Sequence, residues 1–175
     1  MKQAMSFFIL MFGTIILSSS TPAEKSNINW ITVTELNNLY KANPKPVLID
    51  IYTDWCGWCK EMDRRTYTNQ KLVKYVNEKY YAVKFDAESK EDLTFNGKIY
   101  KYNKQYKTHD LALYLMSGQV SYPTTVFMAG TNTQPAPIPG FMKPKEIEGP
   151  IKYFGEKADK TETFVEFNKK LHTQW

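Results

Sequence analysis

The amino-acid sequence predicts an α/β protein with a central mixed β-sheet flanked by helices. Residues 47–52 are apolar on both alternating faces except for Asp50, which is typical of a central strand covered by helices on both sides. Helical and extended patterns alternate along the chain in the order helix, strand, helix, strand, insert, strand, strand, helix. Residues 135–141 form a proline-interrupted run that suits an edge strand. The length of 175 residues predicts a single domain.

The first predicted elements are a helix and the central strand. Residues 32–35, Thr-Val-Thr-Glu, fit a capping box and predict a helix that continues to about residue 42. Residues 43–46 contain two prolines, which end the helix because proline lacks a backbone donor and disfavours helix in the residue before it. The buried strand at 47–52 therefore begins directly after them.

Alternating elements follow this strand. Helix-favouring residues come after Cys56, a second helical stretch begins near Asn69, and residues 80–86 have the pattern of another strand. An Asn-Gly pair within residues 94–99 predicts a tight hairpin, and residues 109–116 look helical. The later predicted elements are a β-branched and aromatic strand, the edge strand and two closing helices, at residues 124–128, 135–141, 145–154 and 163–171.

Composition restricts the class of protein. Hydrophobic residues make up 42% of the chain and aromatic residues 15%, which supplies a core and argues against disorder. The 23 basic and 18 acidic residues give 23 − 18 = +5, which indicates a mildly basic surface. Four lysines alternate with three tyrosines at residues 98–107, and a solvated hairpin and loop explain them better than a nucleic-acid surface. We therefore expect no nucleic-acid partner.

The cysteine and histidine counts also exclude several classes of site. Two cysteines are too few for the disulfide framework of a small secreted scaffold. His109 and His172 are the only histidines and have no companion ligand at metal spacing, so a closed zinc site would need carboxylates as well. We therefore expect no metal and no bound cofactor, and we assign neither histidine a function.

The first residues have the pattern of a secretory signal peptide. Lys2 precedes a largely apolar stretch at residues 4–17, and small residues then permit cleavage after Ser20 or after Ala23. The apolar stretch is shorter than the about 20 residues that a transmembrane helix needs, and an uncleaved membrane anchor is the alternative. We expect residues 1–20 to be the signal and residues 24–175 the exported domain, periplasmic or extracellular, or tethered to the membrane where the signal is retained.

Residues 55–60, Trp-Cys-Gly-Trp-Cys-Lys, place two thiols three residues apart at the start of a predicted helix. Unpaired N–H groups and the positive dipole end at a helix N-terminus favour a thiolate, so Cys56 is the expected nucleophile. Cys59 lies one turn later and is expected to be more buried, which suits the resolution of a mixed disulfide. A static disulfide is the alternative, but closing so short a loop stabilises little. The motif therefore predicts redox chemistry at these two cysteines.

Four separated elements carry a resemblance to a known family. They are the strand at 48–52, the motif at 55–60, the strand at 83–86 and the sequence Tyr122-Pro123-Thr124 leading into a strand. Over roughly residues 47–154 the chain resembles the thioredoxin superfamily. The resemblance implies a thioredoxin-like fold, here with an insert at residues 88–120 before the cis-proline strand and a C-terminal helical extension at residues 156–175.

The resemblance also implies roles for two charged residues. Asp50 stands six residues before Cys56 and matches the buried aspartate that assists proton transfer at the second cysteine. Burial should raise the pKa of Asp50 toward the working range of a thiol relay, whereas a hydrogen-bonded structural aspartate is the alternative. Lys84 matches the lysine near that aspartate, where its charge lowers the pKa of Asp50, and a surface lysine is the alternative.

Substrate contacts are implied in the same way. Tyr122-Pro123 matches the cis-proline site, where the backbone of the preceding residue binds an extended substrate as an added strand. The expected substrate-binding residues are Trp55, Gly57, Trp58, Tyr122 and Pro123. Thioredoxin itself has proline where Trp58 stands, and ordinary packing explains Trp58 equally well.

The sequence thus predicts an exported thiol:disulfide oxidoreductase, with reduction of protein disulfides favoured. The favoured direction follows from Asp50 and from the absence of a histidine between the cysteines, because strong oxidants of the superfamily usually have one. The expected partners are a disulfide-containing protein substrate and an electron donor that is a membrane protein or another thiol protein. A disulfide oxidase or isomerase and a non-catalytic binding or chaperone module are the alternatives, and the oligomeric state is left open.

Overall fold

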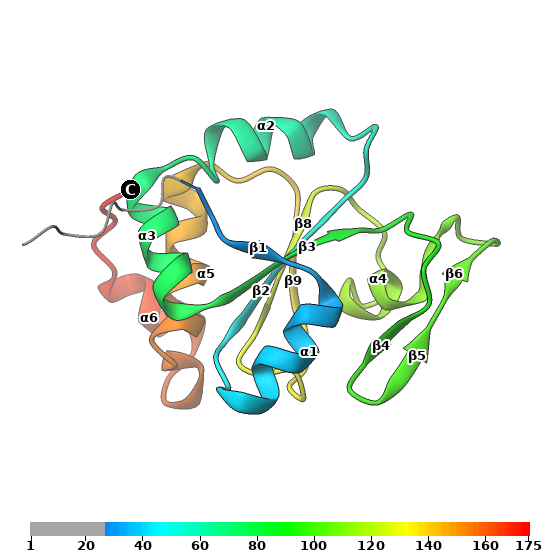
Figure 1. Cartoon of the computed structure of the whole chain (residues 1–175). Coiled ribbons are helices and arrows are strands. Elements are labelled where there is room, and N and C mark those ends of the chain that lie inside the picture. Colours follow the sequence, from blue (N-terminus) through cyan, green and yellow to red (C-terminus); the bar gives the residue numbers. More distant parts are fainter. Residues whose placement is uncertain (1–26) are drawn as a thin grey trace, which may run out of the picture.

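A computed structural model describes residues 27–175, so the predicted signal segment and its cleavage sites lie outside the described residues. Five strands form a mixed sheet in the order β1-β3-β2-β8-β9 (Figure 1). β1 and β2 are parallel to β3, whereas β8 is antiparallel to β2 and to β9. The strands of this sheet are β1 (Trp30–Ile31), β2 (Val47–Tyr52), β3 (Tyr81–Asp86), β8 (Thr124–Met128) and β9 (Ala136–Pro139). The predicted mixed sheet and its central strand are confirmed.

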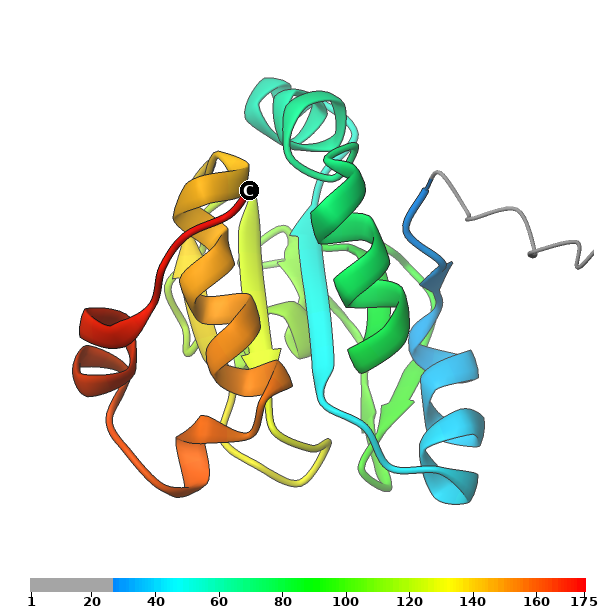
Figure 2. The ribbon, with the colours of Figure 1, turned by 90° about the vertical axis from the view of Figure 1, so that its left-hand side faces the viewer.

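Helices cover both faces of the sheet. One face packs against α1 (Val33–Ala42), α4 (Asp110–Leu115) and part of the insert. The other face packs against α2 (Gly57–Arg65), α3 (Gln70–Lys79) and α5 (Pro144–Gly155), of which α3 and α5 lie in front of the sheet in Figure 2. No helix within residues 27–175 has the length and apolar character needed to cross a bilayer.

The alternation of side chains along β2 decides what each helix layer touches. Leu48 belongs to the core beneath α2, α3 and α5, whereas Ile49 and Ile51 belong to the core beneath α1 and α4. Because successive side chains of a strand point to opposite faces, Asp50 shares the face of Leu48. The one acidic residue of the central strand therefore points toward the layer that contains α2.

Local sequence signals set the helix boundaries. Thr32 and Glu35 form the predicted capping box, in which the Glu35 backbone N–H donates to the Thr32 hydroxyl and the Glu35 carboxylate accepts from the Thr32 backbone N–H. The side chain of Asn69 accepts from two backbone N–H groups at the start of α3. His109 caps α4 through its ring nitrogen, which accepts from the backbone N–H of Leu111.

The insert at residues 88–120 consists of two hairpins followed by α4. Asn96 and Gly97 have φ angles of +50° and +76° and join β4 (Leu93–Phe95) to β5 (Lys98–Tyr100), so the predicted Asn-Gly hairpin is confirmed. The second hairpin, β6 (Tyr102–Asn103) with β7 (Thr108–His109), was not predicted. Neither was β1, because a strand of two residues is too short to produce an alternating pattern.

The C-terminal segment folds back onto α5. A short 3₁₀ helix, η1 (Ala158–Lys160), leads to α6 (Phe164–Lys170), and the chain then returns to Glu148 of α5. The fully buried Glu148 carboxylate accepts hydrogen bonds from the backbone N–H groups of Gln174 and Trp175 and forms an ion pair of 2.7 Å with Lys152. One buried carboxylate therefore holds the end of the chain.

Replacing Glu148 with alanine is expected to lower the free energy of unfolding by about 3 kcal/mol, because it leaves a largely buried Lys152 and two backbone donors without their partner. Burial raises the pKa of Glu148, but Lys152 and the backbone donors outweigh burial and lower it overall. The native protein therefore favours the charged form, and this stability is present above the unfolded pKa of about 4.3 and lost as the pH falls through the folded pKa.

Urea unfolding of the wild type and of E148A at pH 7 and pH 3 tests this expectation. The difference between the two proteins should shrink at pH 3. E146A serves as a matched control, since Glu146 lies on the same helix and caps its first turn from an exposed position. An equal loss for E148A at both pH values would contradict a role for the Glu148 charge.

Candidate active site

Three chain segments meet at one edge of the sheet. The parallel strands β2 and β3 both end there, with Tyr52 paired to Asp86. Antiparallel β8 begins there, with Thr124 paired to Ile51. The Cys56 motif follows β2, the insert follows β3 and Pro123 precedes β8. The topology therefore brings together the two most widely separated elements of the predicted site.

Cys56 and Cys59 form a disulfide with a Cα–Cα distance of 5.3 Å. Cys56 is the N-cap of α2, and its Sγ accepts a hydrogen bond of 3.0 Å from the backbone N–H of Cys59. The predicted placement at a helix N-terminus is thus confirmed. The predicted difference in burial is small, because the exposed fractions are 4% for Cys56 and 3% for Cys59. Both cysteines are covered, since each contributes to the first turn of α2 against the sheet.

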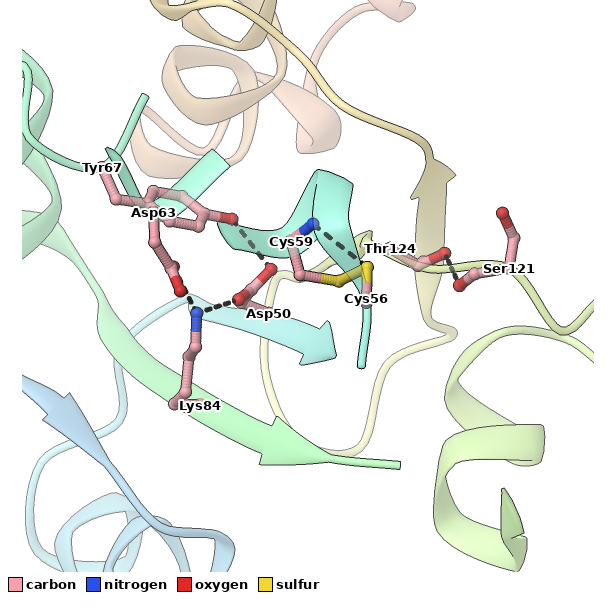
Figure 3. The surroundings of a disulfide bond; sticks show 8 residues. All are labelled: Asp50, Cys56, Cys59, Asp63, Tyr67, Lys84, Ser121 and Thr124. Carbon is pink, nitrogen blue, oxygen red and sulfur yellow. Dashed lines mark hydrogen bonds and ion pairs between the residues drawn. A yellow bond between two sulfur atoms is a disulfide. The ribbon is translucent and has the colours of Figure 1, made fainter. Parts of the chain in front are cut away.

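Asp50 is almost completely buried and has two hydrogen-bond donors. Its Oδ2 accepts from Lys84 Nζ at 2.6 Å and its Oδ1 accepts from the Tyr67 hydroxyl at 3.2 Å, in the surroundings of the disulfide (Figure 3). Burial raises the pKa of Asp50, and the positive charge of Lys84 offsets only part of this effect. A carboxyl group whose pKa lies above its ordinary value is suited to take and return a proton near neutral pH.

Lys84 links the buried aspartate to the outer surface of α2. Its ammonium group contacts Asp50 on one side and the half-exposed Asp63 of α2 on the other (Figure 3). Burial disfavours the charge of Lys84, but the two carboxylates outweigh burial and raise its pKa. The ammonium also lies within 5.0–5.6 Å of the ring centres of Trp30, Tyr52 and Tyr67. These contacts exclude the alternative of an unengaged surface lysine.

The peptide bond between Tyr122 and Pro123 is cis, as the resemblance implies. The Ser121 carbonyl accepts from the Thr124 hydroxyl at 2.8 Å, and the Pro123 carbonyl accepts from the Gly140 N–H at 2.7 Å. Within residues 27–175 the backbone N–H and C=O of Tyr122 have no hydrogen-bond partner. These two groups are the ones that an added strand requires.

Aromatic side chains flank the disulfide on both sides. Trp55 and Trp58 are 65% and 63% exposed, so Trp58 is not a core residue, although it does pack at one edge against Phe141 with a ring-centre distance of 5.6 Å. On the other side Trp55 packs edge-on against Tyr122 at 5.9 Å. A groove of about 360 Å³ lies beside the disulfide, lined by Trp58, Tyr122, Pro123, Gly140 and Phe141.

Gly57 completes the predicted substrate-binding set and is the first residue of α2. A Cβ atom built on Gly57 would meet no atom within 4 Å, so the space above this residue is open. Of the nine predicted site residues, Cys56 and Cys59 form the disulfide, Asp50 and Lys84 form an ion pair in its surroundings, and the other five belong to the cysteine motif or to the cis-proline segment.

Four residues of this region were missed by the sequence reasoning. Asp63 and Tyr67 contact the Asp50–Lys84 pair, while Glu88 and Thr108 belong to the insert. Asp63 follows Cys59 by four residues on a helix, and this spacing could have placed it on the same helix face. The other three carry no sequence signal, because their contacts depend on how the chain folds back on the sheet.

Neither histidine belongs to this site. His109 is fully buried, where Nδ1 accepts from Leu111 N–H and Nε2 lies 2.9 Å from the Glu91 carbonyl, so its contacts are those of a helix cap. His172 is exposed near the C-terminus. In the part of the chain that the structure describes, no three or more His, Cys, Asp or Glu side chains gather as metal ligands.

Residues 21–156 match a protein family described as "Thioredox_DsbH: Protein of unknown function, DUF255". The chain belongs to the Thioredox_DsbH family. Among solved structures, the chain is similar to one titled "DsbH Oxidoreductase", with 16% identity, a TM-score of 0.54 and coverage of 82% of this chain and 95% of that one. A thioredoxin-fold protein from Helicobacter pylori has 19% identity, a TM-score of 0.56 and coverage of 73% and 80%. These structures confirm the thioredoxin-like fold.

Among curated proteins, the chain resembles the thiol:disulfide interchange protein DsbD of Escherichia coli (strain K12). The two are 46% identical over 44 residues, which is 25% of this chain. The match spans only 8% of DsbD, so it relates one segment of that longer protein to this chain. Family, fold and disulfide together place the chain in the thioredoxin superfamily, with a Cys-x-x-Cys disulfide at the helix start.

Proposed function

We propose that this protein is an exported thiol:disulfide oxidoreductase that reduces protein disulfides through Cys56 and Cys59. The observation that carries the proposal is the placement of the Cys56–Cys59 disulfide at the N-terminus of α2, in the surroundings of a buried Asp50. The match to a segment of a thiol:disulfide interchange protein supports the same chemistry. Export is supported by the signal-like pattern of the first residues.

The reaction begins with the reduced dithiol. The Cys56 thiolate attacks one sulfur of the substrate disulfide, a Cys56–substrate disulfide forms, and the first substrate thiolate leaves. The positive end of α2 and the donated Cys59 N–H stabilise the thiolate of Cys56. This step involves no net oxidation or reduction of the complex, because one disulfide forms as another breaks.

Cys59 then completes the exchange. The Cys59 thiol gives its proton to Asp50, and its sulfur attacks Cys56 Sγ, which breaks the mixed disulfide and releases the second substrate thiolate. The substrate has gained two electrons and takes up two protons, and the enzyme is left with the Cys56–Cys59 disulfide. Lys84 and Tyr67 keep the Asp50 carboxylate in place for this transfer. No cofactor other than the cysteine pair takes part.

The substrate is an extended segment that pairs with the backbone of Tyr122. The unpaired N–H and C=O of Tyr122 supply the two hydrogen bonds of an added strand. Trp58 and Pro123 line the groove beside the disulfide, Trp55 borders its other side, and the open space above Gly57 lets the segment approach the sulfur of Cys56. The electron donor that regenerates the dithiol is a membrane protein or another thiol protein.

The reduction potential of the Cys56–Cys59 pair tests the direction of the reaction. We expect a value near the roughly −270 mV of thioredoxin, because no histidine between the cysteines stabilises the reduced form and Asp50 adds a negative charge nearby. Equilibration with glutathione or dithiothreitol buffers, followed by thiol alkylation and mass spectrometry, measures it. A value near about −120 mV would make the protein a strong oxidant and overturn the proposed direction.

A further inference from the structure

The insert at residues 88–120 returns to the active site at Thr108. Thr108 is almost completely buried at the start of β7. Its hydroxyl donates to the Ala87 carbonyl at 3.0 Å and lies 3.0 Å from the Tyr122 hydroxyl. Because a hydroxyl has one proton and that of Thr108 is used on Ala87, Tyr122 is the donor to Thr108. The insert therefore restrains the ring of Tyr122, the residue before the cis-proline, through this hydrogen bond.

A second contact from the insert reaches the same corner of the site. The Trp55 indole N–H donates to the Glu88 carboxylate at 3.1 Å. Trp55 and Tyr122 then pack edge-on against each other, with ring centres 5.9 Å apart. The side chains of Trp55 and Tyr122 thus each form a hydrogen bond with the insert and pack against each other.

The anchor of the insert is independent of the two rings. The Ala87 carbonyl at the end of β3 accepts from the His109 backbone N–H at 2.6 Å as well as from Thr108. His109 is fully buried and caps α4. The second hairpin is therefore fixed to the sheet even where the Thr108 hydroxyl is absent, and removing that hydroxyl changes chiefly the restraint on Tyr122.

We propose that Thr108 is a positioning residue that fixes Tyr122 for the binding of protein disulfides, so that the insert sets how well an extended substrate is recognised. This proposal rests on the proposed function. An extended segment that pairs with the Tyr122 backbone passes close to its ring, whereas a small disulfide reaches Cys56 without that pairing. The restraint on Tyr122 therefore affects the recognition of protein substrates and leaves the thiol chemistry unchanged.

Kinetics of T108V with two substrates test the proposal, since valine keeps the shape of threonine and removes its hydroxyl. With insulin as the protein disulfide and dithiothreitol as the recycling reductant, KM is expected to rise about 5-fold while kcat stays within about 2-fold. The rate with 2-hydroxyethyl disulfide should stay at the wild-type value. T108S restores the hydroxyl and should return KM to normal, and T94V is the matched control on the exposed part of the insert.

Y122F is an independent test of the proposal, because it removes the Tyr122–Thr108 hydrogen bond while Thr108 keeps its hydrogen bond to the Ala87 carbonyl. It should reproduce the rise in KM, and the T108V/Y122F double variant should show no further rise. A wild-type KM for insulin in Y122F, or an equal loss of rate with both substrates, overturns the positioning role. A wild type that reduces neither disulfide overturns the proposed function and this inference together.

Discussion

Replacing Cys59 with alanine is expected to leave substrate proteins covalently attached to Cys56, and replacing Cys56 with serine is expected to abolish turnover. In C59A the Cys56 thiolate still attacks, but no second thiol is present to break the mixed disulfide. In C56S the rate of insulin reduction should fall at least about 1,000-fold, because a hydroxyl is a far weaker nucleophile and cannot form a disulfide. Both cysteines are almost completely buried, and their positions separate their roles: Cys56 is the N-cap of α2, where its sulfur accepts the Cys59 N–H, and Cys59 lies in the first turn.

Non-reducing electrophoresis and mass spectrometry of the adducts in the native compartment provide the measurement. Adducts should disappear when dithiothreitol is added and should be absent from the C56S/C59A double variant. If C59A carries no adducts while the wild type retains its fold, the site acts as a binding or chaperone module, which was the alternative from the sequence. Turnover by C56S at the wild-type rate would remove Cys56 from the mechanism.

Most of the fold follows from local signals in the sequence. The capping box at Thr32 sets the start of α1, the two prolines before residue 47 set the start of β2, and the Asn-Gly pair sets the first hairpin. These signals act over a few residues and therefore survive without knowledge of the rest of the chain. β1 and the second hairpin have strands of two residues and exist through their pairing with distant segments, so no local pattern predicts them.

The residues of the site also fall into two groups, those that local sequence predicts and those that depend on distant contacts. The cysteines are found from their spacing after a buried strand, and Asp50 from the anomaly of one acid in an apolar run. Tyr67 reaches Asp50 only because α2 lies over the Asp50 face of the sheet, and Thr108 reaches Tyr122 only because the insert returns to the end of β3. Burial settles the sign of the Asp50 pKa shift, which the sequence left as a balance between burial and Lys84.

Replacing Asp50 with asparagine is expected to slow the resolving step about 100-fold at pH 7, which is the lower end of the contribution of a general base. Asparagine keeps the size of the side chain but accepts no proton from Cys59. Trapped mixed disulfide should therefore accumulate in D50N during turnover, and the pH dependence that follows the raised pKa of Asp50 should vanish from the rate profile. E61Q is the matched control, since Glu61 lies on α2 and pairs with Arg64 and Arg65.

D50N is expected to lower the rate of resolution but to raise the stability of the oxidised protein at alkaline pH. The folded pKa of Asp50 is raised, so its contribution to stability is full below the unfolded pKa of about 3.9 and is lost as the pH rises through the folded pKa. Oxidised D50N should thus match the wild type near pH 4 and be more resistant to urea near pH 8. If charged Asp50 destabilises the fold and yet accelerates the resolving step, its role is in the reaction and not in stabilising the fold. A loss of stability in D50N near pH 8 that is absent near pH 4 would instead assign Asp50 to the structural ion pair with Lys84.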